Sequence, residues 1–165
     1  MRILGIDPGL AITGYGLIET DPGKPRLIEA GVIRSDAGDA IERRLSEIYE
    51  KVTNLIKDTS PHVAVLEELY SHYKHPRTSI LMGHARGIIC LAINQRGVKL
   101  VSYPSTRVKK AITGRGHASK QQIQRTVVSF LNLKGVPEPV DVTDALALAM
   151  AHANVCTHEN KGIFV

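Results

Sequence analysis

The feature that most limits the fold is a run of three strand-like segments at the start of the chain, joined by segments too short to hold a helix. We expect strands over residues 2–6, 13–18 and 26–34, with Asp7-Pro8-Gly9 as a turn after the first. Parallel strands need a long crossover connection, usually a helix, and these connections are too short for one. The opening of the chain therefore predicts an antiparallel three-stranded meander.

A buried strand and several helices follow the meander. Val63-Ala-Val-Leu66 is a short, continuously apolar run, typical of a strand that is buried on both faces of a sheet. A second strand is expected over residues 99–103, and apolar periodicity predicts helices over residues 41–56, 77–94, 105–113, 120–133 and 143–154. Together these elements predict an α/β fold with one mixed five-stranded sheet, three antiparallel strands and then two parallel ones, flanked by helices.

The expected organisation is one domain over residues 1–155, with residues 156–165 as a loosely held tail. A chain of 165 residues can bury roughly two thirds of its unfolded surface without help from disulfides. No apolar run approaches the ~18 residues of a membrane span, and the strand-like N-terminus does not have the pattern of a secretory signal. We therefore expect a cytoplasmic protein with no membrane role.

Charge is distributed very unevenly along the chain. Residues 69–137 contain 12 Lys or Arg and no acid, whereas the remainder holds 21 − 12 = 9 basic and 16 acidic residues. The two parts therefore carry +12 and −7, although the whole chain carries only +5. Clustered Lys and Arg gain affinity for polyanions by releasing counterions from phosphates. The pattern favours nucleic-acid binding over an ordinary solvated basic face.

Two acids stand at the ends of predicted strands. Asp7 follows the first strand and opens the Pro-Gly turn, and Glu67 follows the buried strand that ends at Leu66. Asp before Pro-Gly is also common turn chemistry, so Asp7 alone is ambiguous. Glu68 competes with Glu67, but strand alternation sends neighbouring side chains to opposite faces, so only one of them is expected to join Asp7.

Asp141 and Asp144 lie three residues apart at the start of the last predicted helix, which places both carboxylates on one face of its first turn. Helix capping and interaction with the helix dipole would also explain this pair. Convergence favours chemistry, because acids from three separate elements can meet at one edge of the sheet. Crowded carboxylates repel one another unless a cation neutralises them, and Mg²⁺ prefers such oxygen ligands. Two such ions suit phosphodiester cleavage.

The segment from Thr106 to Lys120 is the strongest candidate for phosphate contact. Gly114 and Gly116 allow close approach of the backbone, and Ser119 with Gln122 forms a capping-box pattern at the start of a helix. A phosphate there would meet free amides, the helix dipole and Lys120. A flexible basic loop is the alternative. The expected DNA-binding residues are Arg107, Lys109, Lys110, Arg115, Lys120 and Tyr70, where Tyr70 or Tyr73 could stack on bases or simply pack.

Small residues recur along the helix predicted over residues 77–94. Ser79, Gly83 and Gly87 are spaced by four residues, a pattern that lets another backbone approach closely. That neighbour is either the protein's own sheet or a second subunit, and the pattern alone leaves both open.

An ordered series of motifs resembles the bacterial RuvC family over about residues 1–155. The series consists of Gly5-Ile-Asp-Pro-Gly9, Thr13-Gly-Tyr-Gly16, Leu66-Glu67, Gly83-His-Ala-Arg-Gly87, Tyr103-Pro-Ser-Thr-Arg-Val-Lys109, Gly114-Arg-Gly116, Lys120 and Asp141-Val-Thr-Asp-Ala-Leu-Ala147. The opening motif alone is weak, but the ordered series is highly specific.

The resemblance implies a ribonuclease H-like fold and a homodimer that nicks two strands of like polarity in four-way DNA junctions, leaving 5′-phosphate and 3′-hydroxyl ends. It also implies Mg²⁺ or Mn²⁺ held by Asp7, Glu67, Asp141 and Asp144, with Lys109, Lys120 and Tyr70 acting on DNA. The helix over residues 77–94 would form the dimer contact, and the RuvA-RuvB motor would be a partner.

Three other functions share some of these features. A kinase or ATPase of the actin and hexokinase superfamily has a similar opening strand, but it needs a second comparable domain to close over nucleotide, so we expect no nucleotide. A non-catalytic junction-binding protein would be expected to lack one or more of the acids. A YqgF-like nuclease shares the fold and the opening motif, but Asp141 with Asp144 and the long basic middle agree better with RuvC.

Overall fold

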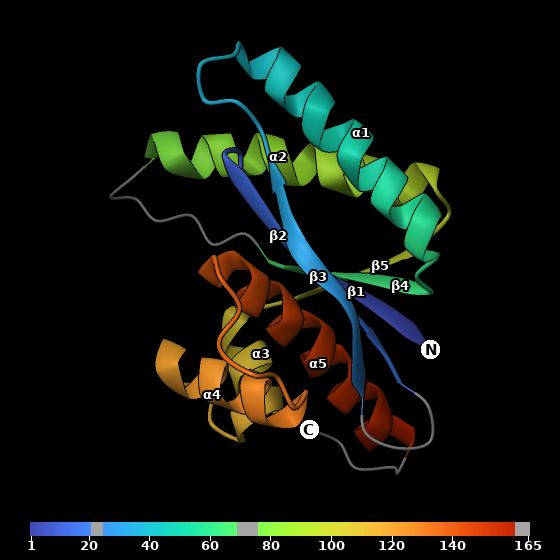
Figure 1. The fold of residues 1–165 in the computed structure, drawn as a ribbon, viewed down its shortest axis with the longest axis vertical. Helices are drawn as coiled ribbons and strands as arrows, with labels where there is room; N and C mark the ends of the chain where they lie inside the picture. Colours follow the sequence, from blue (N-terminus) through green and yellow to red (C-terminus); the bar gives the residue numbers. More distant parts are fainter. Residues whose placement is uncertain (21–24, 69–75, 161–165) are drawn as a thin grey trace.

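The computed structural model describes residues 1–20, 25–68 and 76–160. Its centre is a five-stranded sheet in the order β3-β2-β1-β4-β5 (Figure 1). The strands are β1 (Arg2–Asp7), β2 (Ile12–Glu19), β3 (Arg26–Arg34), β4 (Val63–Glu67) and β5 (Lys99–Tyr103). The first three pair antiparallel, and β4 and β5 continue the sheet parallel to β1. The predicted mixed, ribonuclease H-like sheet is confirmed.

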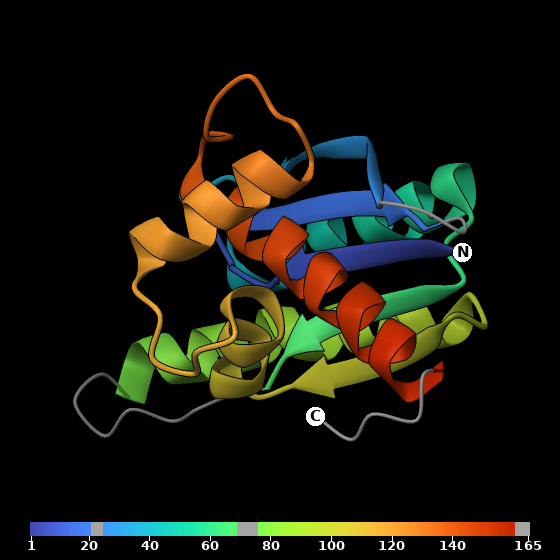
Figure 2. The same cartoon turned by 90° about the horizontal axis from the view of Figure 1, so that it is seen from below.

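Helices cover both faces of this sheet (Figures 1 and 2). One face carries α1 (Ile41–Thr59) and α2 (Pro76–Gln95), which pack against each other. The other face carries α3 (Ser105–Thr113), α4 (Lys120–Phe130) and α5 (Val140–Asn160), with α5 lying directly on β1 and β2. The sheet therefore separates two apolar cores, one beneath α1 and α2 and one beneath α3, α4 and α5.

Strand alternation divides the apolar side chains between the two cores. Val63 and Val65 of β4 belong to the core beneath α5, while Ala64 and Leu66 belong to the core beneath α1 and α2. All four are at most 3% exposed, which confirms that this apolar run is a strand buried on both faces. The same alternation places Glu67 on the α5 side and Glu68 on the opposite side.

Two helices end at other residues than the sequence predicts, and each has a left-handed residue at its C-cap or directly after it. Helix α1 continues past its predicted end at residue 56 to Thr59. Ser60 caps it with φ 47°, and the Ser60 amide donates a hydrogen bond to the main-chain oxygen of Ile56. Helix α4 stops at Phe130 instead of reaching residue 133, because Asn132 adopts φ 52°. A left-handed residue redirects the chain away from the helix axis, which no apolar periodicity can reveal.

Helix α5 is longer at both ends than the sequence predicts. Helical hydrogen bonding begins early, since the Val142 amide donates to the Pro139 oxygen at 3.0 Å. At the other end the helix runs through Asn160, and Val155 is still buried. The predicted tail, residues 156–165, thus begins inside α5, and residues 161–165 lie outside the described part of the chain.

Within the described residues, no helix combines the length and apolar character needed to cross a membrane.

Candidate active site

Asp7 and Glu67 end two neighbouring parallel strands. Ile6 of β1 pairs with Leu66 of β4, so the two acids that follow leave the sheet at the same edge. Asp7 points to the same face of the sheet as Ile3, and Glu67 to the same face as Val65. Ile3 and Val65 both face α5. The sheet therefore directs both carboxylates toward the layer that contains α5.

Helix α5 brings the other two acids over this edge. Gly14 of β2 pairs with Asp7, and a β-carbon at Gly14 would lie 2.1 Å from the main-chain oxygen of Asp141. The first turn of α5 thus rests on the strand beside Asp7, with Asp141 inside that turn. Asp144 lies one helical turn further along the same face. The structure therefore brings together all four acids that the sequence selected.

The grouping changes the protonation of Asp7. Burial is the largest cause that raises the pKa of the Asp7 carboxyl, followed by the negative charges of Asp144, Asp141 and Glu67, and the pKa reaches about 7. The ammonium of Lys120 acts in the opposite direction. A carboxyl with this pKa holds a proton near neutrality unless a cation displaces it.

Glu67 has a more balanced environment. Burial raises the pKa of the Glu67 carboxyl, and Asp144 contributes in the same direction. Lys109, a hydrogen bond from the Ser105 hydroxyl and Lys120 lower it. Ser105 is the first residue of α3, and sequence reasoning missed its role. Its signal was its place within the Tyr103-Pro-Ser-Thr motif, directly after β5.

Lys120 forms an ion pair with one of the four acids. Its Nζ atom lies 2.9 Å from Oδ2 of Asp144, and this hydrogen bond raises the pKa of Lys120. The predicted capping box is present, because the Gln122 amide donates to the Ser119 hydroxyl at 3.3 Å and the Ser119 amide to Gln122 Oε1 at 2.8 Å. This cap fixes the start of α4 and therefore the backbone position of Lys120.

A hollow of about 270 Å³ is lined by two of the four acids, Glu67 and Asp144, and by Lys109 and Lys120. Its polar lining comes from the ends of β4, α3, α4 and α5, and its floor is apolar; the lining residues are Glu67, Ser105, Val108, Lys109, Lys120, Ile123, Asp144, Ala147 and Leu148. Carboxylate oxygens and ammonium groups thus share one concave surface, as a site for a cation and a phosphate requires.

Carboxylate oxygens are ligands that hard divalent cations prefer. The four side chains, however, are not arranged around a common point. Among the residues that the structure describes, no three acids, histidines or cysteines are placed to enclose an ion. Asp144 instead forms an ion pair with Lys120. The carboxylates of Asp144, Asp141 and Glu67 add to burial in raising the pKa of Asp7, and a bound cation would act in the opposite direction.

Comparison with known proteins identifies the family. The family model described as "Crossover junction endodeoxyribonuclease RuvC" matches residues 3–152. A protein of that name from Rhodopirellula baltica is 50% identical over 90% of this chain and 83% of its own length, and one from Moorella thermoacetica is 44% identical over 93% and 92%. This chain belongs to the RuvC family. The structure described as Thermus thermophilus RuvC in complex with Holliday junction substrate has a TM-score of 0.90 and 29% identity, covering 96% of each chain.

The other basic residues predicted for this RuvC chain lie around the site rather than in it. The Arg107 guanidinium stacks over the Tyr103 ring, 5.0 Å from its centre, and lines a second hollow with Lys110 and Gly116. Arg115 lines a third hollow beside Arg125 on α4. The basic residues therefore divide into two that line the carboxylate hollow and three on the adjoining surface of α3 and the loop before α4. Tyr70 and Tyr73 lie outside the described residues.

The small-residue stripe on α2 does not pack on the protein's own sheet. A β-carbon at Gly83 or Gly87 would meet nothing within 4 Å. Ile80 and Leu91 on the same helix are 59% and 45% exposed, and Ser79 is half-buried. The sequence allowed either the protein's own sheet or a second subunit as the neighbour of this stripe. At Gly83 and Gly87 the protein's own sheet is excluded.

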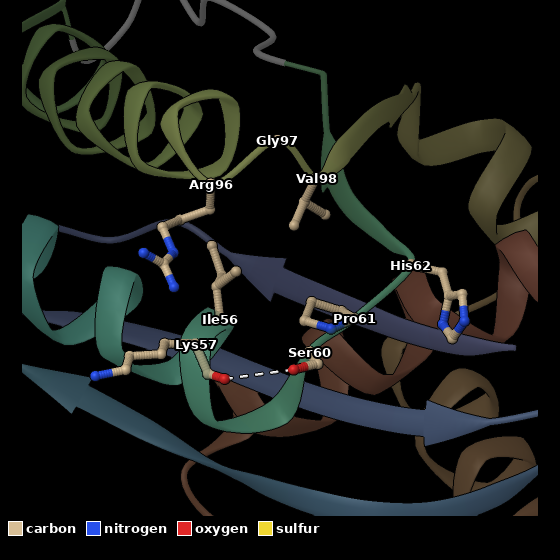
Figure 3. Close-up of a pocket in the computed structure, with 8 residues that line it drawn as sticks. All are labelled: Ile56, Lys57, Ser60, Pro61, His62, Arg96, Gly97 and Val98. Atoms are coloured by element: carbon tan, nitrogen blue, oxygen red, sulfur yellow. Dashed lines mark hydrogen bonds between the residues drawn. The ribbon is translucent and has the colours of Figure 1, made fainter.

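A separate hollow of about 370 Å³ lies at the opposite edge of the sheet (Figure 3). It is formed where α1 and α2 end and where β4 and β5 begin, and it is lined by Ile56, Lys57, Ser60, Pro61, His62, Arg96, Gly97 and Val98. Its lining contains no acid. The four acids selected from the sequence of this RuvC chain lie instead at the ends of β1 and β4 and at the start of α5.

Proposed function

We propose that this protein is a Holliday junction resolvase, an endonuclease that nicks two strands of like polarity symmetrically in four-way DNA junctions. The products would be 5′-phosphate and 3′-hydroxyl ends. One observation carries the proposal: acids from β1, β4 and α5 converge beside two lysines, and burial together with this convergence raises the pKa of Asp7 to about 7. Membership of the RuvC family supports the choice of a branched DNA substrate.

Asp7, Glu67, Asp141 and Asp144 would hold Mg²⁺, with Mn²⁺ as a substitute and two ions per site. The donor set supports this assignment because all four groups offer carboxylate oxygens, which hard divalent cations prefer. When bound, such cations supply water activation and charge stabilisation for phosphodiester cleavage. Binding would also relieve the mutual repulsion that raises the pKa of Asp7.

The chain's own cations and hydroxyl have distinct tasks in this proposal. Lys109 and Lys120 flank Glu67 and Asp144 in the hollow, where their ammonium groups can bind the scissile phosphate and stabilise developing negative charge. Lys120 would exchange Asp144 for phosphate as DNA arrives, while α4 presents free amides beside it. Ser105 holds the Glu67 carboxylate in one orientation. Arg107, Lys110 and Arg115 would bind the DNA backbone further away.

A second copy of the chain would pack on α2. The stripe of Ser79, Gly83 and Gly87, with the exposed apolar side chains of Ile80 and Leu91 on the same helix, supports a close helix contact. A homodimer would present two sites to the two strands of a symmetric junction. The RuvA-RuvB motor as a partner and a cytoplasmic location stay predictions, as does a role for Tyr70 in opening the junction.

The test compares cleavage of a four-way junction with cleavage of a linear duplex of the same sequence in Mg²⁺, with the nicks mapped on each strand. We expect paired nicks in strands of like polarity and little cutting of the duplex. Asp7→Asn should bind the junction and not cut it, whereas Asp58→Asn, on the exposed face of α1, is the matched control and should cut normally. Equal cutting of both substrates would reject junction selectivity, and metal-independent binding without nicking would support a non-catalytic protein.

A further inference from the structure

Arg86 of α2 reaches the main chain at the end of β4. Its Nε atom donates to the main-chain oxygen of Glu67 at 3.2 Å, and its Nη2 atom donates to the Ser102 hydroxyl on β5 at 2.9 Å. Both bonds are partly buried. A single guanidinium therefore bridges three elements next to a residue that the proposed function makes a metal ligand.

The peptide unit that follows Glu67 is held at both of its polar atoms. Its oxygen accepts from Arg86, and its nitrogen, the amide of Glu68, donates to the Tyr103 oxygen at 2.9 Å. Glu67 is the last residue of β4, and it lies beyond the register in which β4 pairs with β1. Without Arg86 this peptide would lose the bond that fixes its carbonyl, and the bond of the Glu68 amide to β5 would open more often.

Arg86 acts from the face of the sheet opposite to the carboxylates. It belongs to α2, which covers the face that also receives Leu66, whereas the Glu67 side chain faces the α5 layer. The carboxylate hollow is lined by other residues, with Lys109 and Lys120 as its cations. Arg86 is therefore placed to orient the backbone of Glu67 and not to bind metal or DNA itself.

We propose that Arg86 is a positioning residue for the active site: it fixes the Glu67 peptide and so ties the geometry of the catalytic edge to helix α2. The inference rests on the proposed metal-binding role of Glu67. Residues that orient metal ligands matter, because their loss costs about 10–100-fold in metal affinity or activity. Gly87, in the stripe proposed for dimer contact, follows Arg86 directly, so the same helix would carry both the contact and the link to Glu67.

The first measurement uses the metal alone. We titrate the full-length protein, without DNA, with Mn²⁺ and follow free Mn²⁺ by electron paramagnetic resonance. Arg86→Met keeps much of the aliphatic stem and removes the donors, and we expect its Mn²⁺ dissociation constant to rise about 10–100-fold. Arg86→Lys retains one charged donor and should recover part of the affinity. Arg96→Met is the matched control, because Arg96 is an exposed arginine at the far edge of the sheet.

Two further measurements separate positioning from general loss of structure. The single-turnover nicking rate of Arg86→Met should fall and partly recover at high Mn²⁺, while junction binding measured in Ca²⁺ stays at the wild-type value. Hydrogen exchange of the metal-free protein should accelerate at least about tenfold at the Glu68 amide and remain unchanged in the centre of β4. A purely structural arginine would lower junction binding, Mn²⁺ affinity and global protection together.

Wild-type Mn²⁺ affinity and nicking rate in folded Arg86→Met would overturn the inference. If that variant does not fold, Arg86→Gln is used instead, because it keeps a neutral donor on a side chain too short to reach both the Glu67 oxygen and the Ser102 hydroxyl. Wild-type Mn²⁺ affinity in Arg86→Gln would also overturn the inference. Failure of the proposed function is recognised separately. In that case Asp7→Asn and wild type would bind Mn²⁺ equally, and the exchange of the Glu68 amide would still report whether Arg86 holds this peptide.

Discussion

Asp7→Asn should stabilise the metal-free protein while it abolishes cleavage. Asn has nearly the same shape as Asp and carries no charge, so the substitution removes the repulsion from Asp144, Asp141 and Glu67 without opening a cavity. In the folded protein the pKa of Asp7 rises from an ordinary 3.8 to about 7. The folded state thus prefers the neutral acid, and ionising it lowers the free energy of unfolding.

The size and the sign of this effect follow from proton linkage. Below the ordinary pKa, Asp7 is neutral in both states and the two proteins should be equally stable. As pH rises from 3.8 to about 7, wild type loses stability relative to the variant, and above that range the difference is constant. At about 1.4 kcal/mol per pKa unit the ceiling is about 4 kcal/mol. Asp7 is only half-buried, so we expect about 2 kcal/mol, equivalent to a Tm higher by roughly 4–8 °C.

The assay is thermal and urea unfolding of both proteins in chelator at matched concentration, at about pH 5 and about pH 8. Comparing the two proteins cancels the titration of histidines that they share. Added Mg²⁺ should raise the stability of wild type more than that of Asp7→Asn, because the cation binds the ionised carboxylates. A variant that is less stable than wild type at pH 8 without metal, or a difference that does not grow with pH, would refute the electrostatic reasoning.

Three further changes test the other parts of the site and the α2 surface. Lys120→Met should slow nicking by about 10²-fold and change stability by less than ~1 kcal/mol, because its ion pair is largely exposed; nicking kinetics and urea unfolding measure the two effects. Gly14→Ala should destabilise the protein by about 3 kcal/mol in urea unfolding, since its β-carbon would clash with the start of α5, whereas Gly135→Ala meets open space. Leu91→Glu should convert a dimer to monomer in sedimentation and leave the unfolding midpoint nearly unchanged; a dimer that persists would place the contact elsewhere.

Much of the fold is predictable because it depends on local patterns. The short connections at the start of the chain exclude crossover helices, and the apolar run Val63–Leu66 permits burial on both faces. Helix ends are predicted less well. Ser60 at the cap of α1 and Asn132, one residue after the cap of α4, have left-handed backbone, which side-chain periodicity does not encode. The acids expected to converge and the acid-free basic tract already indicate metal-assisted phosphodiester chemistry, and the family resemblance narrows the DNA to a four-way junction.

The acidic residues of the candidate site are predictable from the sequence, whereas the residues that hold them in place are less so. Acids at strand ends and at a helix start are visible in the sequence because their positions follow from the elements themselves. Ser105 and Arg86 are not visible in this way, because their partners are an acid across the hollow and a main-chain oxygen across the sheet. Such contacts depend on how the elements pack in the folded protein, so the spacing of residues in the sequence does not predict them.

The glycines of the first two strands allow α5 to approach the sheet closely, which the sequence alone does not reveal. In the sequence, Gly5 reads as part of a motif that leads into a Pro-Gly turn. In the structure a β-carbon at Gly5 would lie 1.9 Å from the Ala145 oxygen, and one at Gly14 would lie 2.1 Å from the Asp141 oxygen. Ordinary side chains would hold the helix away from the sheet. Because α5 carries two of the four acids, its close approach brings them within electrostatic reach of Asp7. The arrangement of the candidate site therefore depends on the absence of side chains at these glycines as much as on the acids themselves.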